Sequence, residues 1–166
     1  LEKSIGINST VISINADGID KDLFELATVV VLKPSFPKRF SFSKSGNEWL
    51  EKNAHNYDIA AIHTIWGAFQ VKAAQILHQK HIPFMIWPHG SLDPFDLQKK
   101  HYLKKLLGPF MIRPMLDKSR AIICTAKLEA EKLETYGSKI KPKVLPLPIS
   151  PPNGKGLRER FRRNLH

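Results

Sequence analysis

Short apolar runs that alternate with amphipathic segments constrain the fold of this 166-residue chain more than any other feature. The runs are rich in β-branched residues and bounded by Gly, Pro, Asn or Asp, which is typical of strands. Six are predicted as strands: residues 10–15, 28–32, 58–63, 83–87, 121–124 and 143–145. Helices are expected at residues 45–53, 67–79, 94–107 and 127–136, with a shorter one, after a break at 108–109, ending near 118. This order predicts a parallel α/β sheet, in which the run at 58–63, apolar on both faces, is covered on both sides.

The places where these strands end carry the first functional prediction. Three strands end, in chain order, at His63, at Pro88-His89-Gly90 and at Cys124-Thr125. The carboxyl ends of parallel strands meet at one edge of a sheet, and ligands of such folds bind there. We therefore expect one edge that presents two histidines.

Composition narrows the class of protein. Apolar residues make up 42% of the chain, which is enough to build a core. The longest mostly apolar stretch, residues 24–32, is about half of the roughly 20 residues that a membrane-spanning helix needs. A single cysteine, Cys124, excludes an internal disulfide framework, and we expect it to be a small buried strand residue. With no signal peptide at its start, a soluble cytoplasmic domain is predicted, and the missing initial Met indicates an excerpt of a longer protein.

Positive charge is concentrated late in the chain, whose formal net charge is +11. Residues 98–166 hold 17 Lys and Arg against 5 Asp and Glu, whereas residues 1–97 are nearly neutral. Such asymmetry fits a surface that faces nucleic acid, acidic lipid or a phosphorylated substrate, and it equally fits solvated helix faces. The basic amphipathic helix expected at 94–107 fits either an anionic membrane surface or packing on the sheet. Charge alone leaves these alternatives open.

The strand ends carry sequence strings that resemble a known family. They are Ile-His-Thr-Ile-Trp-Gly at 62–67, Pro-His-Gly-Ser-Leu-Asp-Pro at 88–94, and Ala-Ile-Ile-Cys-Thr-Ala at 121–126 followed by Glu129 and Glu131. Their order and spacing over residues 58–149 closely resemble the amino-terminal domain of glycosyltransferase family 4 (group 1). The resemblance implies an α/β fold, with a Rossmann-like parallel sheet flanked by helices, as one domain of a GT-B architecture.

The resemblance also implies what surrounds the chain. Family members begin with a strand and a Gly-rich loop that would precede Leu1, and a carboxy-terminal domain that holds most of the nucleotide-sugar would follow His166. We therefore expect residues 1–149 to be a Rossmann-like acceptor-side domain that lacks its first strand. Residues 150–166 are expected to be an interdomain linker with a basic helix. Such a partial chain is expected to be inactive alone.

The resemblance selects His89 as the catalytic candidate, because the family places a histidine there beside the reacting sugar. An exposed imidazole on an edge loop can also hydrogen-bond a sugar hydroxyl or a phosphate oxygen. The alternative is a turn histidine that bonds nearby backbone. The substrate-binding candidates are His63, Trp66, Gly90 and Thr125.

Each substrate-binding candidate has a plainer structural interpretation. His63 is equally well explained as a strand-end residue packed beneath the next helix, and Trp66, expected to stack on a sugar ring, is more often a core residue. Gly90 either lets the backbone approach a ligand or supplies a positive φ angle. Thr125 and Glu129 lie where a strand becomes a helix, and ordinary helix-start chemistry explains both.

The implied function is a retaining glycosyltransferase of hexosyltransferase type, dependent on a nucleotide-sugar and using neither a metal nor another cofactor. Its acceptor would be a saccharide or a lipid-linked one, in polysaccharide or glycolipid biosynthesis, and peripheral contact with the inner membrane face fits such an acceptor. The alternative is a non-enzymatic basic module in which residues 98–166 bind nucleic acid or an anionic membrane. No recognised nucleic-acid motif is present, so we expect no nucleic-acid partner.

Overall fold

All six predicted strands are present in the computed structural model, which describes residues 6–15, 23–36, 40–91, 108–135 and 137–147. The strands are β1 (Thr10–Ser13), β2 (Thr28–Val31), β3 (Ala60–His63), β4 (Phe84–Trp87), β5 (Ala121–Cys124) and β6 (Lys143–Val144). The helices are α1 (Leu23–Leu26), α2 (Lys44–Asn53), α3 (Ala68–Gln79), α6 (Arg113–Asp117) and α7 (Lys127–Thr135). A 3₁₀ turn, η3 (Ala54–Asn56), follows α2, and a π-helical turn, η4 (Gly108–Ile112), precedes α6.

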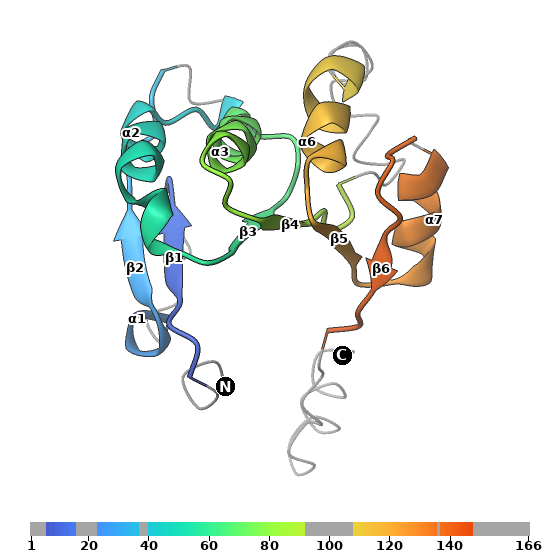
Figure 1. The fold of residues 1–166 in the computed structure, drawn as a ribbon, viewed down its shortest axis with the longest axis horizontal. Coiled ribbons are helices and arrows are strands. Elements are labelled where there is room, and N and C mark those ends of the chain that lie inside the picture. Colours follow the sequence, from blue (N-terminus) through green and yellow to red (C-terminus); the bar gives the residue numbers. More distant parts are fainter. Residues whose placement is uncertain (1–5, 16–22, 37–39, 92–107, 136, 148–166) are drawn as a thin grey trace, which may run out of the picture.

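Every strand pair of the described residues is parallel, as predicted. β1 pairs with β2 in one sheet, and β3, β4, β5 and β6 follow one another in a second sheet (Figure 1). Parallel pairing requires each connection between neighbouring strands of the second sheet to cross back to the end of the sheet where the strands begin. The α/β, Rossmann-like fold class predicted from the sequence is therefore confirmed.

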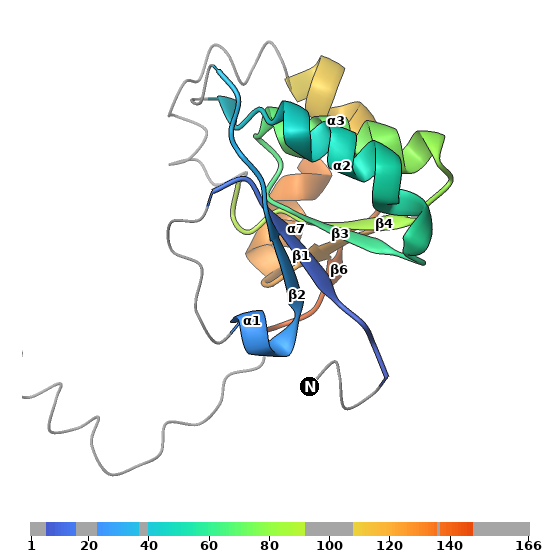
Figure 2. The same ribbon diagram turned by 90° about the vertical axis from the view of Figure 1, so that its left-hand side faces the viewer.

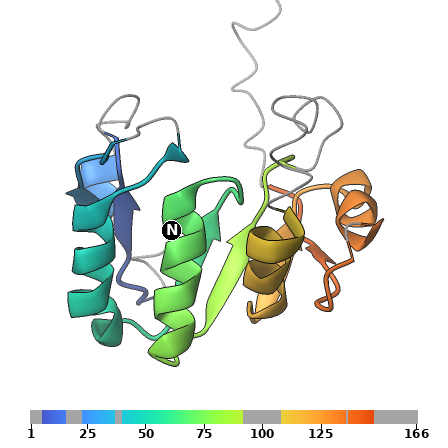
Figure 3. The same cartoon turned by 90° about the horizontal axis from the view of Figure 1, so that it is seen from above.

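The core lies between the second sheet and the helices that cover one of its faces. Figure 3 shows α2, α3 and α6 side by side, with α3 packed on β3 and β4. The apolar side chains on the inner side of α3 are buried, and so are Ile62, Ile86 and Ile122 of β3, β4 and β5. Burial of these side chains supplies most of the stabilisation, since each removes apolar surface from water.

The expectation that the strand at 58–63 is covered on both sides is wrong. Ile62 is buried beneath the helices, but Ala61 and His63 point to the opposite face and are exposed. Within the described part of the chain, no helix packs over these two residues. Alanine is small and is compatible with such an open face.

A serine precedes α2 and connects it to the segment that follows β2. The Ser43 hydroxyl accepts a hydrogen bond from the Gly46 N–H (3.0 Å) and donates one to the Lys33 carbonyl (2.8 Å). The first bond satisfies one of the N–H groups left unpaired at a helix start. Gly46 then allows close packing on α3, because a Cβ there would lie 2.6 Å from Phe69 Cε2.

The shorter helix expected after Gly108-Pro109 is present as α6, which ends at Asp117. Gly108 and Pro109 belong to the π-helical turn η4, which runs directly into α6. Proline is tolerated in the first turn of a helix, because its missing N–H would have no intrahelical acceptor there. The helix expected at 94–107 and the linker and basic helix at 150–166 lie outside the described residues.

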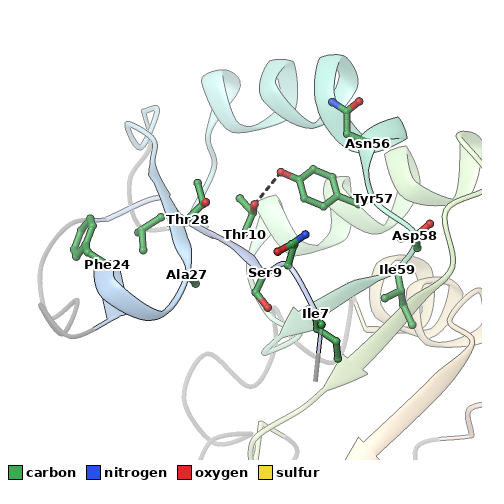
Figure 4. Close-up of a pocket in the computed structure, with 13 residues that line it drawn as sticks. Ile7, Ser9, Thr10, Phe24, Ala27, Thr28, Asn56, Tyr57, Asp58 and Ile59 are labelled. Atoms are coloured by element: carbon green, nitrogen blue, oxygen red, sulfur yellow. Dashed lines mark hydrogen bonds between the residues drawn. The ribbon is translucent and has the colours of Figure 1, made fainter. Parts of the chain in front are cut away.

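The β1–β2 sheet is joined to the second sheet near the amino ends of the strands. Figure 2 shows β1 and β2 side by side with α2 near them. The Tyr57 hydroxyl, in the segment before β3, donates a hydrogen bond to Thr10 Oγ1 of β1 (3.0 Å; Figure 4). A cavity of about 770 Å³ opens here, lined by residues 6–10, 24, 27–29 and 56–59. It lies at the opposite end of the strands from the predicted site.

Within the described residues, no helix is both long and apolar enough to span a membrane.

Candidate functional site

The carboxyl ends of β3, β4 and β5 meet at one edge of the second sheet. His63, the last residue of β3, pairs with Trp87, the last residue of β4, and Ile86 pairs with Ile122 of β5. The Thr64 N–H continues the pairing by donating to the Trp87 carbonyl (2.9 Å). The segment after each strand therefore leaves the sheet at the same edge, as the sequence predicted.

The two histidine side chains meet at this edge. His63 Nδ1 and His89 Nε2 are 2.8 Å apart and share a hydrogen bond. The ring centroids are 5.1 Å apart and the planes differ by 11°, so the imidazoles lie nearly coplanar and touch edge to edge. The Trp87 ring lies about equally far from both, 6.1 and 6.2 Å between centroids, and nearly parallel to them. The three rings are therefore nearly parallel and gather at the carboxyl ends of β3 and β4.

A tight turn after β4 presents His89. The φ angles of His89 and Gly90 are +50° and +71°, and the Ser91 N–H donates to the Pro88 carbonyl (3.1 Å). Positive φ at both central residues with this bond is the pattern of a type I′ turn. The Ser91 hydroxyl donates to the same carbonyl. A Cβ on Gly90 would meet nothing within 4 Å, so its backbone angle, and not lack of space, calls for glycine.

Two of the four described non-glycine residues with positive φ lie at this edge. Thr64, directly after β3, has φ +64°, and His89 has φ +50°. A β-branched residue such as threonine rarely adopts a positive φ. Such residues persist only where the surroundings hold them, and they cluster at functional sites. Thr64 directly follows His63, and His89 is the other residue of the imidazole pair.

Trp66 holds the turn from one side. Its indole Nε1 donates a hydrogen bond to the Ser91 carbonyl (2.7 Å), and the half-buried ring packs against the core. The ring was predicted to stack on a sugar. In the structure its one polar atom, Nε1, bonds the Pro88–Ser91 turn. The predicted role as a sugar platform stays a prediction.

Glu129 holds the turn from the other side. Its Oε1 accepts a hydrogen bond from the Gly90 N–H (2.6 Å). Its Oε2 accepts from the Thr125 N–H (2.8 Å) and the Thr125 hydroxyl (3.2 Å). Thr125 itself, predicted to bind substrate, is therefore connected to the histidine turn through this carboxylate.

The electrostatics of the site favour a neutral His63. Partial burial, and then the neighbouring His89 imidazole, lower the pKa of His63 below the ordinary value of 6.5. A neutral His63 can both donate and accept, so the hydrogen bond to His89 is kept near neutral pH. The role of each ring nitrogen depends on the tautomer.

Cys124 is a buried strand residue, as predicted. Its burial, and then the Glu129 carboxylate, raise the pKa of the thiol to about 11. The thiol is therefore protonated at neutral pH and is a poor nucleophile.

Sequence reasoning missed two residues of this site. Trp87 was treated only as part of a strand, although it ends β4 and its register opposite His63 places the two side chains on one face of the sheet. Glu129 was assigned to ordinary helix-start chemistry. That assignment explains its contact with Thr125, but no sequence signal pointed to Gly90, which is 39 residues earlier.

No group of three or more His, Cys, Asp or Glu side chains in the described ranges is placed to hold a metal ion. The site therefore consists of two imidazoles, an indole surface and a turn whose backbone is held from both sides. These are groups that hydrogen-bond hydroxyls and phosphate oxygens and pack on sugar rings.

The parallel α/β sheet and the position of the site at the carboxyl ends of its strands define the class of protein: Rossmann-like domains that bind ligands at this edge. Residues 4–151 match the family described as Glycosyltransferase Family 4. The chain belongs to this family, and the match confirms the predicted resemblance to its amino-terminal, GT-B-type domain. Members act on a nucleotide-sugar donor and an acceptor. No curated protein matches the chain.

Proposed function

We propose that this chain is the acceptor-side domain of a retaining glycosyltransferase that uses a nucleotide-sugar. The proposed reaction transfers a hexose to a saccharide or lipid-linked acceptor, in polysaccharide or glycolipid biosynthesis. Membership of glycosyltransferase family 4 supports the reaction class, and the edge site supports the location of the chemistry. We assign residues 1–149 to this domain and residues 150–166 to the linker and basic helix.

The observation that carries the proposal is the hydrogen bond between the two imidazoles. It engages Nε2 of His89 and orients the ring, which leaves Nδ1 without a partner within the described part of the chain. That nitrogen donates or accepts according to the tautomer, and a sugar hydroxyl can do either. His89 is therefore proposed to contact the reacting sugar, with His63 holding its ring.

The leaving nucleoside diphosphate gains negative charge during transfer. Preorganised hydrogen-bond donors are the usual means of stabilising such charge in a closed site. His89 as an Nδ1–H donor fits this requirement, because its ring orientation is already set before substrate binds. Trp87 is proposed to pack against the apolar face of a sugar ring beside it.

Replacing His89 by Ala tests the assignment. We expect the turnover of sugar transfer in the intact protein to fall by about 10²-fold or more, the usual effect of losing a positioned acid–base group. Transfer from nucleotide-sugars is measured, and the anomeric configuration of the product is read by NMR. Retained configuration supports a retaining reaction.

The matched control is His78→Ala, the same change at an exposed position late in α3. It should leave turnover unchanged. Thermal unfolding of both variants separates loss of fold from loss of chemistry. Full activity in a folded His89→Ala protein would remove His89 from the mechanism.

A further inference from the structure

Glu129 is buried but its carboxylate faces two different segments. Only 9% of the residue is exposed. One oxygen accepts from the N–H and hydroxyl of Thr125, on the connection from β5 to α7, and the other accepts from the Gly90 N–H, in the turn after β4. A buried carboxylate is costly unless its oxygens are hydrogen-bonded, and here both are.

The helix start explains only one of these contacts. Glu129 is the third residue of α7, and a glutamate there commonly reaches back to the backbone before the helix. Thr125 is such a partner. The contact with Gly90 belongs to no helix-start motif, and at 2.6 Å it is the shorter of the two backbone contacts.

The turn needs an external hold because of its own backbone. Its two central residues both have positive φ, and one of them is a histidine. Left-handed backbone is unfavourable for residues other than glycine, so His89 is disfavoured there by itself. A hydrogen bond from the Gly90 N–H to a buried carboxylate favours the one backbone geometry in which that N–H points at Glu129.

We propose that Glu129 is a positioning residue, which holds the Pro88–Ser91 turn and thereby the His89 imidazole against His63. The inference rests on the proposed function, since it gives the turn the task of presenting His89 to the sugar. Glu129 itself contacts neither ring. It acts through Gly90, the neighbour of His89 in the chain.

Glu129→Gln is the sharpest test. A glutamine has one acceptor oxygen, and its NH₂ group would face either the Gly90 N–H or the Thr125 N–H, so one of the two contacts is lost. We expect kcat to fall between about tenfold and 100-fold, with the KM for the nucleotide-sugar nearly unchanged. Glu131→Gln is the matched control, because it makes the same change at an exposed position on α7.

NMR provides a readout that is independent of activity. In the unmutated protein, the Gly90 amide proton should exchange slowly with solvent although Gly90 is exposed, and Glu129→Gln should speed that exchange and shift the His89 ring nitrogen resonances. Fast exchange of Gly90 in the unmutated protein would overturn the proposal, and this measurement needs no variant to fold. Unshifted His89 resonances in a folded Glu129→Gln protein would also overturn it.

The two proposals fail separately. If His89→Ala keeps full activity while Glu129→Gln shifts the His89 resonances, the role of His89 in transfer is wrong but the hold on the turn is supported. If His89→Ala is inactive and Glu129→Gln changes neither the resonances nor kcat, the role of Glu129 is wrong and that of His89 stands.

Discussion

Single residues at the carboxyl edge depart from ordinary backbone and ordinary titration. Thr64 and His89 adopt positive φ angles, and the two imidazoles share one hydrogen bond. That hydrogen bond needs one of the two facing nitrogens to be without a proton, so protonation of both rings would remove it. The lowered pKa of His63 makes this sensitivity to acid measurable in the stability of the protein.

We expect the free energy of unfolding to fall as the pH drops below 6.5, the ordinary pKa of histidine. The folded state binds a proton at His63 less readily than the unfolded chain does, so acid favours unfolding. Above that pH His63 is neutral in both the folded and the unfolded state, so its titration does not change the free energy of unfolding. Urea unfolding between about pH 7.5 and about pH 5.5 measures the loss.

His63→Gln is the comparison for this prediction, since glutamine keeps a hydrogen-bonding side chain but does not titrate. The decrease in stability on acidification should be smaller in the variant than in the unmutated protein. Equal decreases in the two proteins would show that His63 does not contribute.

At the scale of the elements, the contact between α2 and α3 depends on one small residue. Gly46 lies in the first turn of α2, where the absent side chain leaves room for Phe69 of α3. Helix propensity alone would favour alanine here by up to about 1 kcal/mol. The added Cβ would lie 2.6 Å from Phe69 Cε2 and 3.0 Å from Ser43 Oγ, so packing opposes propensity.

Gly46→Ala is expected to destabilise the protein by about 1 to 2 kcal/mol, because overpacking of a closed contact outweighs the gain in helix propensity. Chemical unfolding measures the change. In a Phe69→Leu background, which removes the clashing ring atoms, the same substitution should cost less. An equal cost in both backgrounds would contradict the packing argument.

At the scale of the whole molecule, the strands form two parallel sheets, not one. β1 pairs only with β2 and β3 only with β4 among the described strands. The side-chain bond from Tyr57 to Thr10 ties the smaller sheet to the larger near the cavity in Figure 4. The smaller sheet also buries less, since all four residues of β1 are half-buried and two of β2 are exposed.

Tyr57→Phe is expected to loosen the smaller sheet selectively. Losing the hydroxyl removes one hydrogen bond, which is worth about 1 kcal/mol. Amide hydrogen exchange should speed up in β1 and β2 and stay unchanged in β4 and β5, where Ile86 and Ile122 are fully buried. A uniform increase across both sheets would show that they unfold as one unit.

Strand positions were predictable because each strand is specified locally. The strand at 121–124 was placed to the residue, and the helix at 67–79 to within one residue, since apolar periodicity marks both and Gly67 marks the start of the helix. Coverage of β3 was misjudged at Ala61, because alanine is compatible with either a packed or an open face. A sequence shows that a residue is small, but not whether another element packs over it.

The sequence by itself determined the order of strands and helices, the parallel sheet and the gathering of His63, His89 and Thr125 at one edge. Only the tertiary structure decided that the two imidazoles meet edge to edge and that Glu129 reaches Gly90. The reason is physical. Strand order follows from local periodicity, whereas a contact between side chains far apart in the chain depends on sheet register and on the φ angles of one turn, and these are set by packing across the whole domain.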